Sequence, residues 1–189
     1  MKNRRLLLAL AVTTVGSAGS TDAQVSSNPL RLWGGVGYGS FGCWDSFSCN
    51  AHVSGEARGA MNGFVGIGGS ITPYFTAGLE LNARAKDEGT STIRMRSASA
   101  VLVVYPAPAI GLHFKVSAGI AGFRHSGTEG DIVLSDAQSI GTVGSLGIGY
   151  DLPLSPRISL TPGFEVGAAS IGNDGYRKMW ETRLRVTWR

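Results

Sequence analysis

The sequence has no apolar stretch long enough to cross a membrane as an α-helix. Its main apolar run, residues 6–15, has about ten residues, whereas a helix needs about 20 to span the ~30 Å hydrocarbon core of a bilayer. No segment keeps the 3.6-residue hydrophobic period of an amphipathic helix. These absences argue against a helical fold, in a membrane or outside one.

The apolar run has the form of an N-terminal secretory signal. It follows a basic segment that contains Lys2, Arg4 and Arg5. Residues 21–23 place small side chains at the −3 and −1 positions, so we predict a signal peptide over 1–23 and one mature domain over 24–189. The net charge of +4 includes three basic residues and one acidic residue of this signal, so the mature chain carries about +2. That charge is poor evidence for nucleic-acid binding.

Cysteine is also scarce. Cys43 and Cys49 are the two cysteines of the chain, and five residues separate them. Export leads to an oxidising compartment, so we predict a short disulfide loop. No histidine pattern accompanies the pair, which argues against a metal or redox centre.

Glycine, in contrast, is abundant, with 28 of 189 residues and no collagen-like period. Many glycines lie inside apolar runs, where they permit curvature and close packing in a narrow barrel. Turn signals divide the mature chain into eight runs that we predict to be strands. They are 30–40, 59–71, 74–86, 92–105, 110–123, 139–152, 157–171 and 179–189.

Several of these runs alternate an apolar and a polar face with the period of two that is typical of a β-strand. In 74–86, for example, Leu79 and Leu81 alternate with Glu80. The apolar faces carry Leu, Ile, Val and Phe, which would form a very large exposed patch in water but are required in lipid. The polar faces combine small residues with charges, as expected for the interior of a narrow barrel. The charged residues predicted to line this interior are Glu80, Arg84, Arg94, Arg96, Lys115, Glu165, Glu181, Arg183 and Arg185. We expect first a pair between Glu165 and either Arg183 or Arg185.

The connections between runs alternate in length. Those near 73, 106–108 and 152–156 are short, and those at 41–58, 87–91, 124–138 and 172–178 are generally longer and polar. Short periplasmic turns and longer outer loops are the pattern of an outer-membrane barrel. Aromatic residues on the apolar faces predict two interfacial girdles. They are Phe75, Tyr105, Tyr150 and Trp188 at the periplasmic ends, with Tyr38 and Trp180 at the outer ends.

Over residues 29–189 this topology, the girdles and the last strand make the sequence similar to the small eight-stranded outer-membrane barrels, the OmpX type and the OmpA transmembrane domain. The resemblance implies an all-β, eight-stranded antiparallel up-and-down transmembrane β-barrel. The last strand resembles the assembly signal of that family through Trp180, Leu184, Val186 and Trp188. Two residues depart from the family pattern. Arg189 follows the terminal aromatic residue, and Pro162 interrupts a strand, where we expect a bulge.

Two motifs suggest chemistry. Residues 37–42, GYGSFG, match a dinucleotide fingerprint, but no helix and no βαβ unit follow. His125 and Ser126 lie near Glu129 and Asp131 at the predicted outer rim, and such a set is suited to acyl transfer, as in the lipid A deacylases. The His-x-Ser-Asn arrangement of those enzymes is absent.

We therefore predict a monomeric, non-enzymatic outer-membrane barrel with a filled interior, no cofactor and no metal, which has a structural or surface-interaction role through its extracellular loops. The partners expected are outer-membrane lipid, lipopolysaccharide and, during biogenesis, the barrel-assembly machinery, but not nucleic acid. Basic residues near the outer rim are candidates for contacts with lipopolysaccharide phosphates. They are Arg58, Lys86, Arg124, Arg177 and Lys178. Two alternatives stay open: a lipid A-modifying hydrolase and a soluble secreted ligand-binding barrel.

Overall fold

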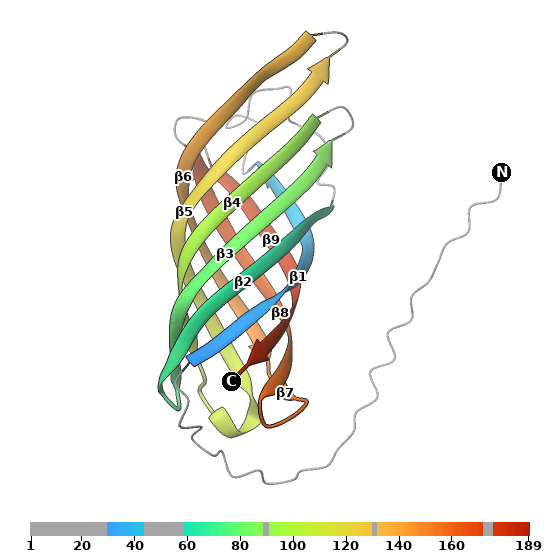
Figure 1. Ribbon diagram of the computed structural model, residues 1–189. Coiled ribbons are helices and arrows are strands. Elements are labelled where there is room, and N and C mark those ends of the chain that lie inside the picture. The colour runs from blue at the N-terminus through green and yellow to red at the C-terminus, as the bar shows by residue number, and fades with distance from the viewer. Residues whose placement is uncertain (1–29, 44–58, 89–90, 130–131, 172–175) are drawn as a thin grey trace, which may run out of the picture.

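One antiparallel sheet closes on itself to form a barrel (Figure 1). The computed structural model describes residues 30–43, 59–88, 91–129, 132–171 and 176–189. Its elements are β1 (Leu30–Cys43), β2 (Gly59–Thr72), β3 (Phe75–Glu88), β4 (Ser91–Val104), η2 (Pro108–Ile110), β5 (Leu112–Glu129), β6 (Ile132–Tyr150), β7 (Leu152–Pro153), β8 (Ile158–Ile171) and β9 (Tyr176–Trp188).

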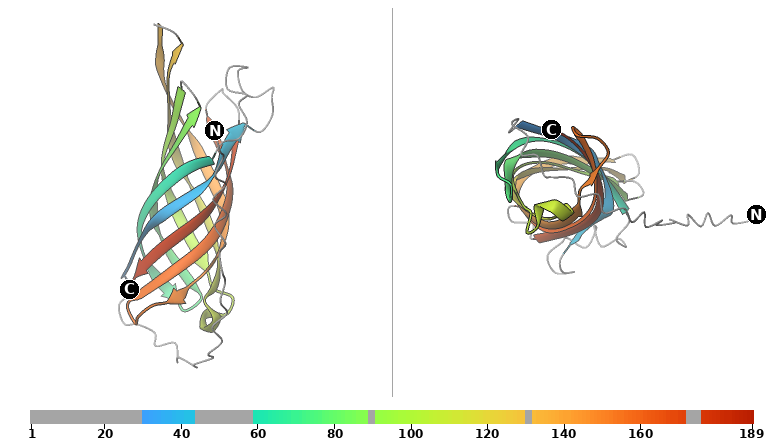
Figure 2. Two further views of the ribbon diagram at one scale, coloured as in Figure 1. Left: turned by 90° about the vertical axis from the view of Figure 1, so that its right-hand side faces the viewer. Right: turned by 90° about the horizontal axis from the view of Figure 1, so that it is seen from below.

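Consecutive strands pair along the sheet, and pairing of β1 with β9 and of β6 with β8 closes the ring, as the view from below in Figure 2 shows. The two-residue strand β7 continues the line of β6, so eight strands cross the barrel. The predicted all-β, eight-stranded antiparallel barrel is therefore confirmed. We call the end where β1 begins and β9 ends the proximal end, and the opposite end the distal end.

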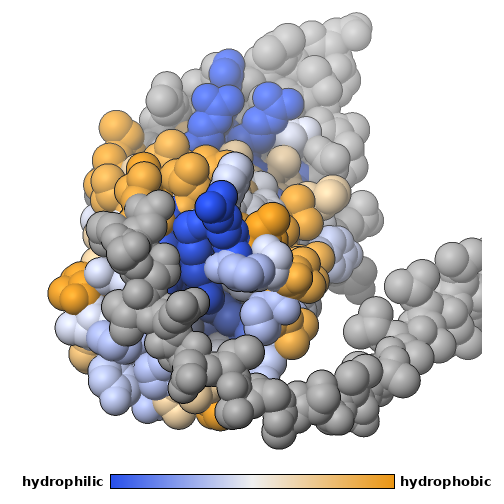
Figure 3. Space-filling model, turned by 60° about the horizontal axis from the view of Figure 1, so that its bottom comes forward, coloured by the Kyte–Doolittle hydropathy of each residue, from blue (hydrophilic) through white to orange (hydrophobic). Residues whose placement is uncertain are grey.

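Side chains alternate between the two faces of the wall as the period of two requires. On β3, Leu79 and Leu81 are exposed on the outside, whereas Glu80 and Arg84 are buried inside. The outer surface carries a band of hydrophobic side chains, and hydrophilic ones gather at the proximal mouth and beyond the band at the far end (Figure 3). A barrel with this distribution is suited to lipid outside and polar contacts within, which is the reverse of a soluble barrel.

The strands β5 and β6 differ from the prediction. They have 18 and 19 residues, against 13 or 14 in the other barrel strands, because residues predicted to be loop extend both strands at the distal end. A strand that leaves the membrane can be polar on both faces, so its composition resembles that of a loop.

The bulge predicted at Pro162 is wrong. The register is the same on both sides of this point, with Gly149 opposite Gly163 and Leu152 opposite Leu160. The ladder is instead interrupted between β6 and β7, where Pro162 has no N–H group to donate. The sheet therefore keeps its register across the proline.

The predicted aromatic girdles need one correction. Five of the six aromatic side chains are exposed on the outer face, from Phe75 at 41% to Tyr38 and Trp188 at 60%. Tyr105 is only 8% exposed and lies inside the barrel, where its hydroxyl donates to Asp151. The described part of the chain contains no helix that is long and apolar enough to cross a membrane.

Candidate functional site

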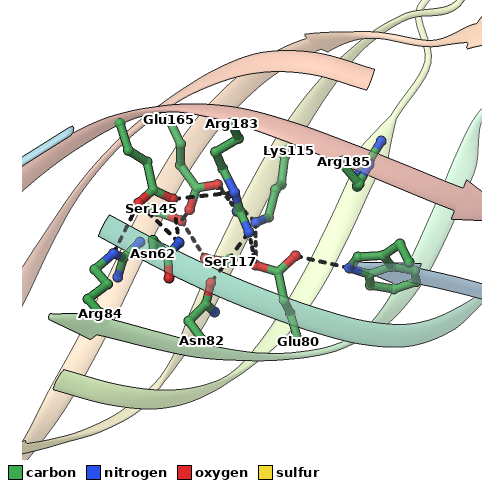
Figure 4. A network of polar contacts seen from close by, with 12 residues as sticks. Asn62, Glu80, Asn82, Arg84, Lys115, Ser117, Ser145, Glu165, Arg183 and Arg185 are labelled. Carbon is green, nitrogen blue, oxygen red and sulfur yellow. Dashed lines mark hydrogen bonds and ion pairs between the residues drawn. The ribbon is translucent and has the colours of Figure 1, made fainter. Parts of the chain in front are cut away.

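The centre of the barrel holds a network of ion pairs around Arg183 of β9 (Figure 4). Its guanidinium Nη2 lies 2.9 Å from Glu80 Oε1 of β3, and its Nη1 pairs with Glu165 of β8. The Nε atom lies 3.3 Å from Glu181 Oε1 on the same strand. The guanidinium carbon also lies 3.5 Å from the centre of the Phe64 ring, a cation–π contact. One side chain thus contacts three carboxylates and an aromatic face.

Two more cations complete the network. Lys115 of β5 places Nζ 2.7 Å from Glu80 Oε1 and 2.9 Å from Glu165 Oε2. Arg84 of β3 places Nε 3.1 Å from Glu181 Oε2. Three carboxylates therefore face three cations, and the network is neutral. All six side chains are at least nine-tenths buried, which requires such pairing because an isolated buried charge is very costly.

Register explains why this arrangement needs Arg183. Glu165 and Glu181 are directly opposite each other on β8 and β9, where like charges destabilise a sheet. Arg183 contacts both glutamates and removes this repulsion. Lys115 then joins Glu165 to Glu80 across the barrel.

Neutral donors satisfy the remaining carboxylate oxygens. Asn62 Nδ2 donates to both oxygens of Glu181, at 3.0 and 3.1 Å, and Ser145 Oγ donates to Glu165 at 2.5 Å. Trp33 Nε1 donates to Glu80 at 3.0 Å. Its indole ring lies over Gly66, where a Cβ atom would come within 2.3 Å of the ring. The glycine-rich strand β2 therefore makes room for a large donor inside a narrow barrel.

A second polar cluster lies at the proximal end around Asp151. Its carboxylate accepts hydrogen bonds from Thr161 at 2.5 Å, Tyr105 at 3.0 Å, Arg185 at 3.3 Å and Arg189 at 3.4 Å. Asp151 lies between β6 and β7, outside the membrane-crossing strands. Burial alone would raise the pKa of this carboxyl, but the positive charge of Arg185 and the other close contacts lower it below its ordinary value.

The distal part of the interior is closed by apolar side chains. These residues are buried and form one cluster: Ala60, Met95, Ala121, Phe123, Val143, Ala169 and Met179. Below this layer, the space beside Glu80, Lys115 and Arg183 has a volume of about 30 Å³, which accommodates little more than water. The interior of the described barrel is therefore packed and not an open channel.

The predicted luminal charges lie in the interior, with two exceptions. Arg94 and Arg96 are exposed on the outer face, so their assignment to the interior is wrong. The inward positions between and beyond them belong to Met95 and Ser97, which are buried. The prediction for β4 failed because it took the polar face of the strand as the inner face. The inner face of β4 includes Met95 of the apolar distal layer, so polar residues do not mark the inside of this strand.

The residues predicted to contact lipopolysaccharide are divided between the two faces. Arg124 and Lys178 are exposed on the outside. Lys86 is 3% exposed and points into the barrel, so an outward contact is wrong for this residue. Arg177 is half-buried on the inward-facing register of β9, and Arg58 lies outside the described residues.

The remaining candidates have these positions. The assembly-signal residues Trp180, Leu184, Val186 and Trp188 are all exposed on the outer face of β9. Residues 37–42 form part of strand β1. His125 and Ser126 belong to β5, but the structure does not describe their side chains, and Cys49 lies outside the described residues. Within the described part of the chain, no three His, Cys, Asp or Glu side chains gather to hold a metal ion.

Several interior residues were not identified from the sequence. Tyr105 was predicted on the outer face, Asp151 fell at the end of the predicted run 139–152 without a role, and Trp33 and Asn62 were not singled out. The alternation along β2 could have identified Asn62, because this polar residue lies between Met61 and Gly63, which are both on the outward face. No comparable signal identified Asp151, which lies where the strand pattern ends.

The closed eight-stranded wall, its apolar outer band and its ion-paired interior define a small integral outer-membrane β-barrel. Solved structures share this fold. Neisserial surface protein A has a TM-score of 0.58 and 13% identity, with 84% of this chain and 96% of that chain covered. Ail, the attachment invasion locus protein of Yersinia pestis, has a TM-score of 0.61 and 6% identity, with 85% and 98% covered.

The N-terminal β-barrel domain of OprF from Pseudomonas aeruginosa has a TM-score of 0.50 and 16% identity, with 85% of this chain and 97% of that chain covered. At these identities the likeness concerns the fold. No family model and no curated protein matches the sequence.

Proposed function

We propose that this protein is a non-enzymatic, non-conducting outer-membrane barrel that acts as a structural element of the envelope and as a platform for surface interactions. The packed interior is the observation that carries the proposal. A neutral ion network fills its centre and an apolar layer closes its distal part. Neither region leaves space for a permeating solute.

Planar-bilayer recording tests the closed interior. We expect the wild-type barrel to show only small and rare conductance events. A triple variant, Met95→Gly/Met179→Gly/Arg183→Ser, should conduct in longer-lived steps, because it removes both the apolar layer and the hub of the network. A stable wide-pore conductance from the wild-type protein would contradict the proposal.

The distal end is the part that would face the cell exterior. The signal peptide predicted over 1–23 would deliver the chain to the periplasm, and the barrel-assembly machinery would insert it as a monomer with the proximal end inward. The extended hairpin of β5 and β6 would then project outward. Ail, which has the same fold, has been crystallised with the heparin analogue sucrose octasulfate, and that supports a surface-binding role here.

A deletion of the hairpin tip, residues 127–134, would test this role. We expect the shortened barrel to fold, because the pairing of β4 with β5 below the tip remains, and to lose surface attachment or envelope integrity in cells. Mass spectrometry of lipid A from cells with and without the protein separates the hydrolase alternative. A change in lipid A acylation that depends on the protein would refute the non-enzymatic assignment.

A further inference from the structure

A small void lies inside the proximal end of the barrel. Its volume is about 10 Å³, which is room for one particle of about the size of a water molecule. Arg31 of β1 and Arg185 of β9 line it, together with the hydroxyl-bearing side chains of Tyr105 and Thr187. No carboxylate side chain is among the described residues that line this void, so the charge around it is positive.

Two of the lining side chains have hydrogen-bond capacity that the described part of the chain does not use. Thr187 is only 6% exposed, and its Oγ1 atom is buried and has no partner among the described residues. The same is true of the Nε atom of Arg185. An unpaired buried donor is costly, so a ligand that accepts hydrogen bonds from both groups would stabilise this end of the barrel.

The charges near the void do not balance. Asp151 is the carboxylate of the proximal cluster, and it lies 3.3 Å from Arg185 and 3.4 Å from Arg189. It also interacts electrostatically with Arg31, which is close enough to Arg189 for their like charges to repel each other. Three positive charges thus share one negative charge, which leaves an excess of two. The side chain of Arg185 is only 12% exposed, so water screens its charge least.

The surroundings of Arg185 do not supply the missing negative charge. Its Nη2 atom lies 3.1 Å from His113 Nε2, and this nitrogen accepts a hydrogen bond only when it is unprotonated, so the imidazole is neutral in this contact. The central network is also neutral, and Arg185 takes no part in the contacts drawn for it (Figure 4). Residues 24–29, which precede β1, contain no acidic residue. An anion from solution would balance the excess.

We propose that this void binds one chloride ion, held by Arg185 Nε, Thr187 Oγ1 and the guanidinium group of Arg31. A chloride ion is only slightly larger than a water molecule, whereas phosphate and carboxylate compounds need more room. A spherical anion accepts hydrogen bonds from any direction, which suits donors that come from different strands. Val101 and Val103 lie beside the donors and keep the site poorly hydrated, which strengthens the attraction. Because Arg31 belongs to β1 and Thr187 to β9, the ion would hold the first and last strands together.

Bromide locates the site, because it replaces chloride and scatters X-rays anomalously. Crystals of the wild-type barrel grown in sodium bromide should show an anomalous peak between Arg31, Arg185 and Thr187. The peak should be lost in Thr187→Val, which removes the hydroxyl group and keeps the shape of the side chain. Thr182→Val is the matched control, because Thr182 is exposed on the outer face of the same strand, and it should keep the peak.

Urea unfolding in phospholipid vesicles measures the effect of the ion, with sodium chloride compared with sodium gluconate at equal ionic strength. Gluconate is too large for the void. The wild-type midpoint should be higher in chloride and should rise with the logarithm of its concentration, because the ion binds the folded state. Thr187→Val and Arg31→Gln should lose this shift, and Thr182→Val should keep it. In gluconate, Thr187→Val should be at least as stable as the wild type, because it removes an unpaired buried donor.

Heat-modifiable migration on gels in gluconate establishes that each variant is folded. Equal wild-type midpoints in the two salts would overturn the site, and so would a water molecule without an anomalous signal in the bromide crystals. A chloride shift that persists in both Thr187→Val and Arg31→Gln would also overturn it, since the effect would then arise elsewhere on the barrel.

Discussion

Replacement of Arg183 by methionine should reduce the free energy of unfolding more than any other single change in the network. Methionine keeps much of the side-chain length but removes the charge that contacts Glu80, Glu165 and Glu181. Three buried carboxylates would then share Lys115 and Arg84. Breaking a buried ion pair by removing one partner costs about 3–5 kcal/mol, and the repulsion between Glu165 and Glu181 would return, so we expect a loss of at least about 3 kcal/mol.

Urea unfolding of the barrel in phospholipid vesicles, followed by tryptophan fluorescence, measures this loss. Arg157→Met is the control, because Arg157 is exposed, and it should change stability by less than about 0.5 kcal/mol. The double variant Arg183→Met/Glu165→Gln should be more stable than the sum of the two single losses predicts, since it removes one orphaned charge. A loss below about 1 kcal/mol for Arg183→Met would show that the network does not stabilise the barrel as described.

Three further predictions concern the wall, the loop and pH. Leu81→Arg should reduce the free energy of unfolding in lipid by about 2–4 kcal/mol, whereas Leu154→Arg, in a proximal turn, should reduce it much less. Equal unfolding midpoints for the two variants would contradict the lipid-facing position of Leu81. Cys43 and Cys49 should label with a membrane-impermeant thiol reagent on intact cells only after reduction, and labelling beforehand would exclude the disulfide. Because the pKa of Asp151 is lowered in the folded state, its carboxylate stabilises that state at pH values above the ordinary aspartate pKa of about 3.9. This stabilisation is lost as the pH falls through the pKa that Asp151 has in the folded state. Asp151→Asn should therefore lower the urea midpoint at pH 7, and this effect should become smaller as the pH falls below about 3.9, whereas an equal effect at pH 7 and pH 3 would refute this role.

The faces of most strands could be predicted from the sequence because lipid imposes a uniform requirement on one side. Leu79 and Leu81 on β3 and Val116 on β5 satisfy it, and their polar neighbours point inward as a result. The interior imposes no such uniform requirement. Its distal layer is apolar, so Met95 on the inner face of β4 reversed the apparent polarity of that strand and misplaced Arg94 and Arg96.

Apart from the pair of Glu165 and Arg183, the strand patterns could not predict which interior side chains contact one another. A period of two assigns a residue to a face but not to a height along the barrel axis. Height depends on strand tilt and register, which are properties of the closed sheet. The contact between Glu80 and Arg183 joins residues 103 positions apart, and the assembly of donors around Asp151 joins four separate segments.

The same separation has a consequence for the order of folding. Glu80 comes from β3, Lys115 from β5, Glu165 from β8 and Arg183 from β9, so no hairpin contains the network. The contacts of Arg183 with Glu80 and of Glu181 with Arg84 join β9 to β3 across the seam, so they form only when β1 pairs with β9. These ion pairs therefore stabilise the closed ring, whereas the pair of Glu165 with Arg183 already lies within the hairpin of β8 and β9. Opening the seam between the first and last strands would have to break both cross-seam contacts at once.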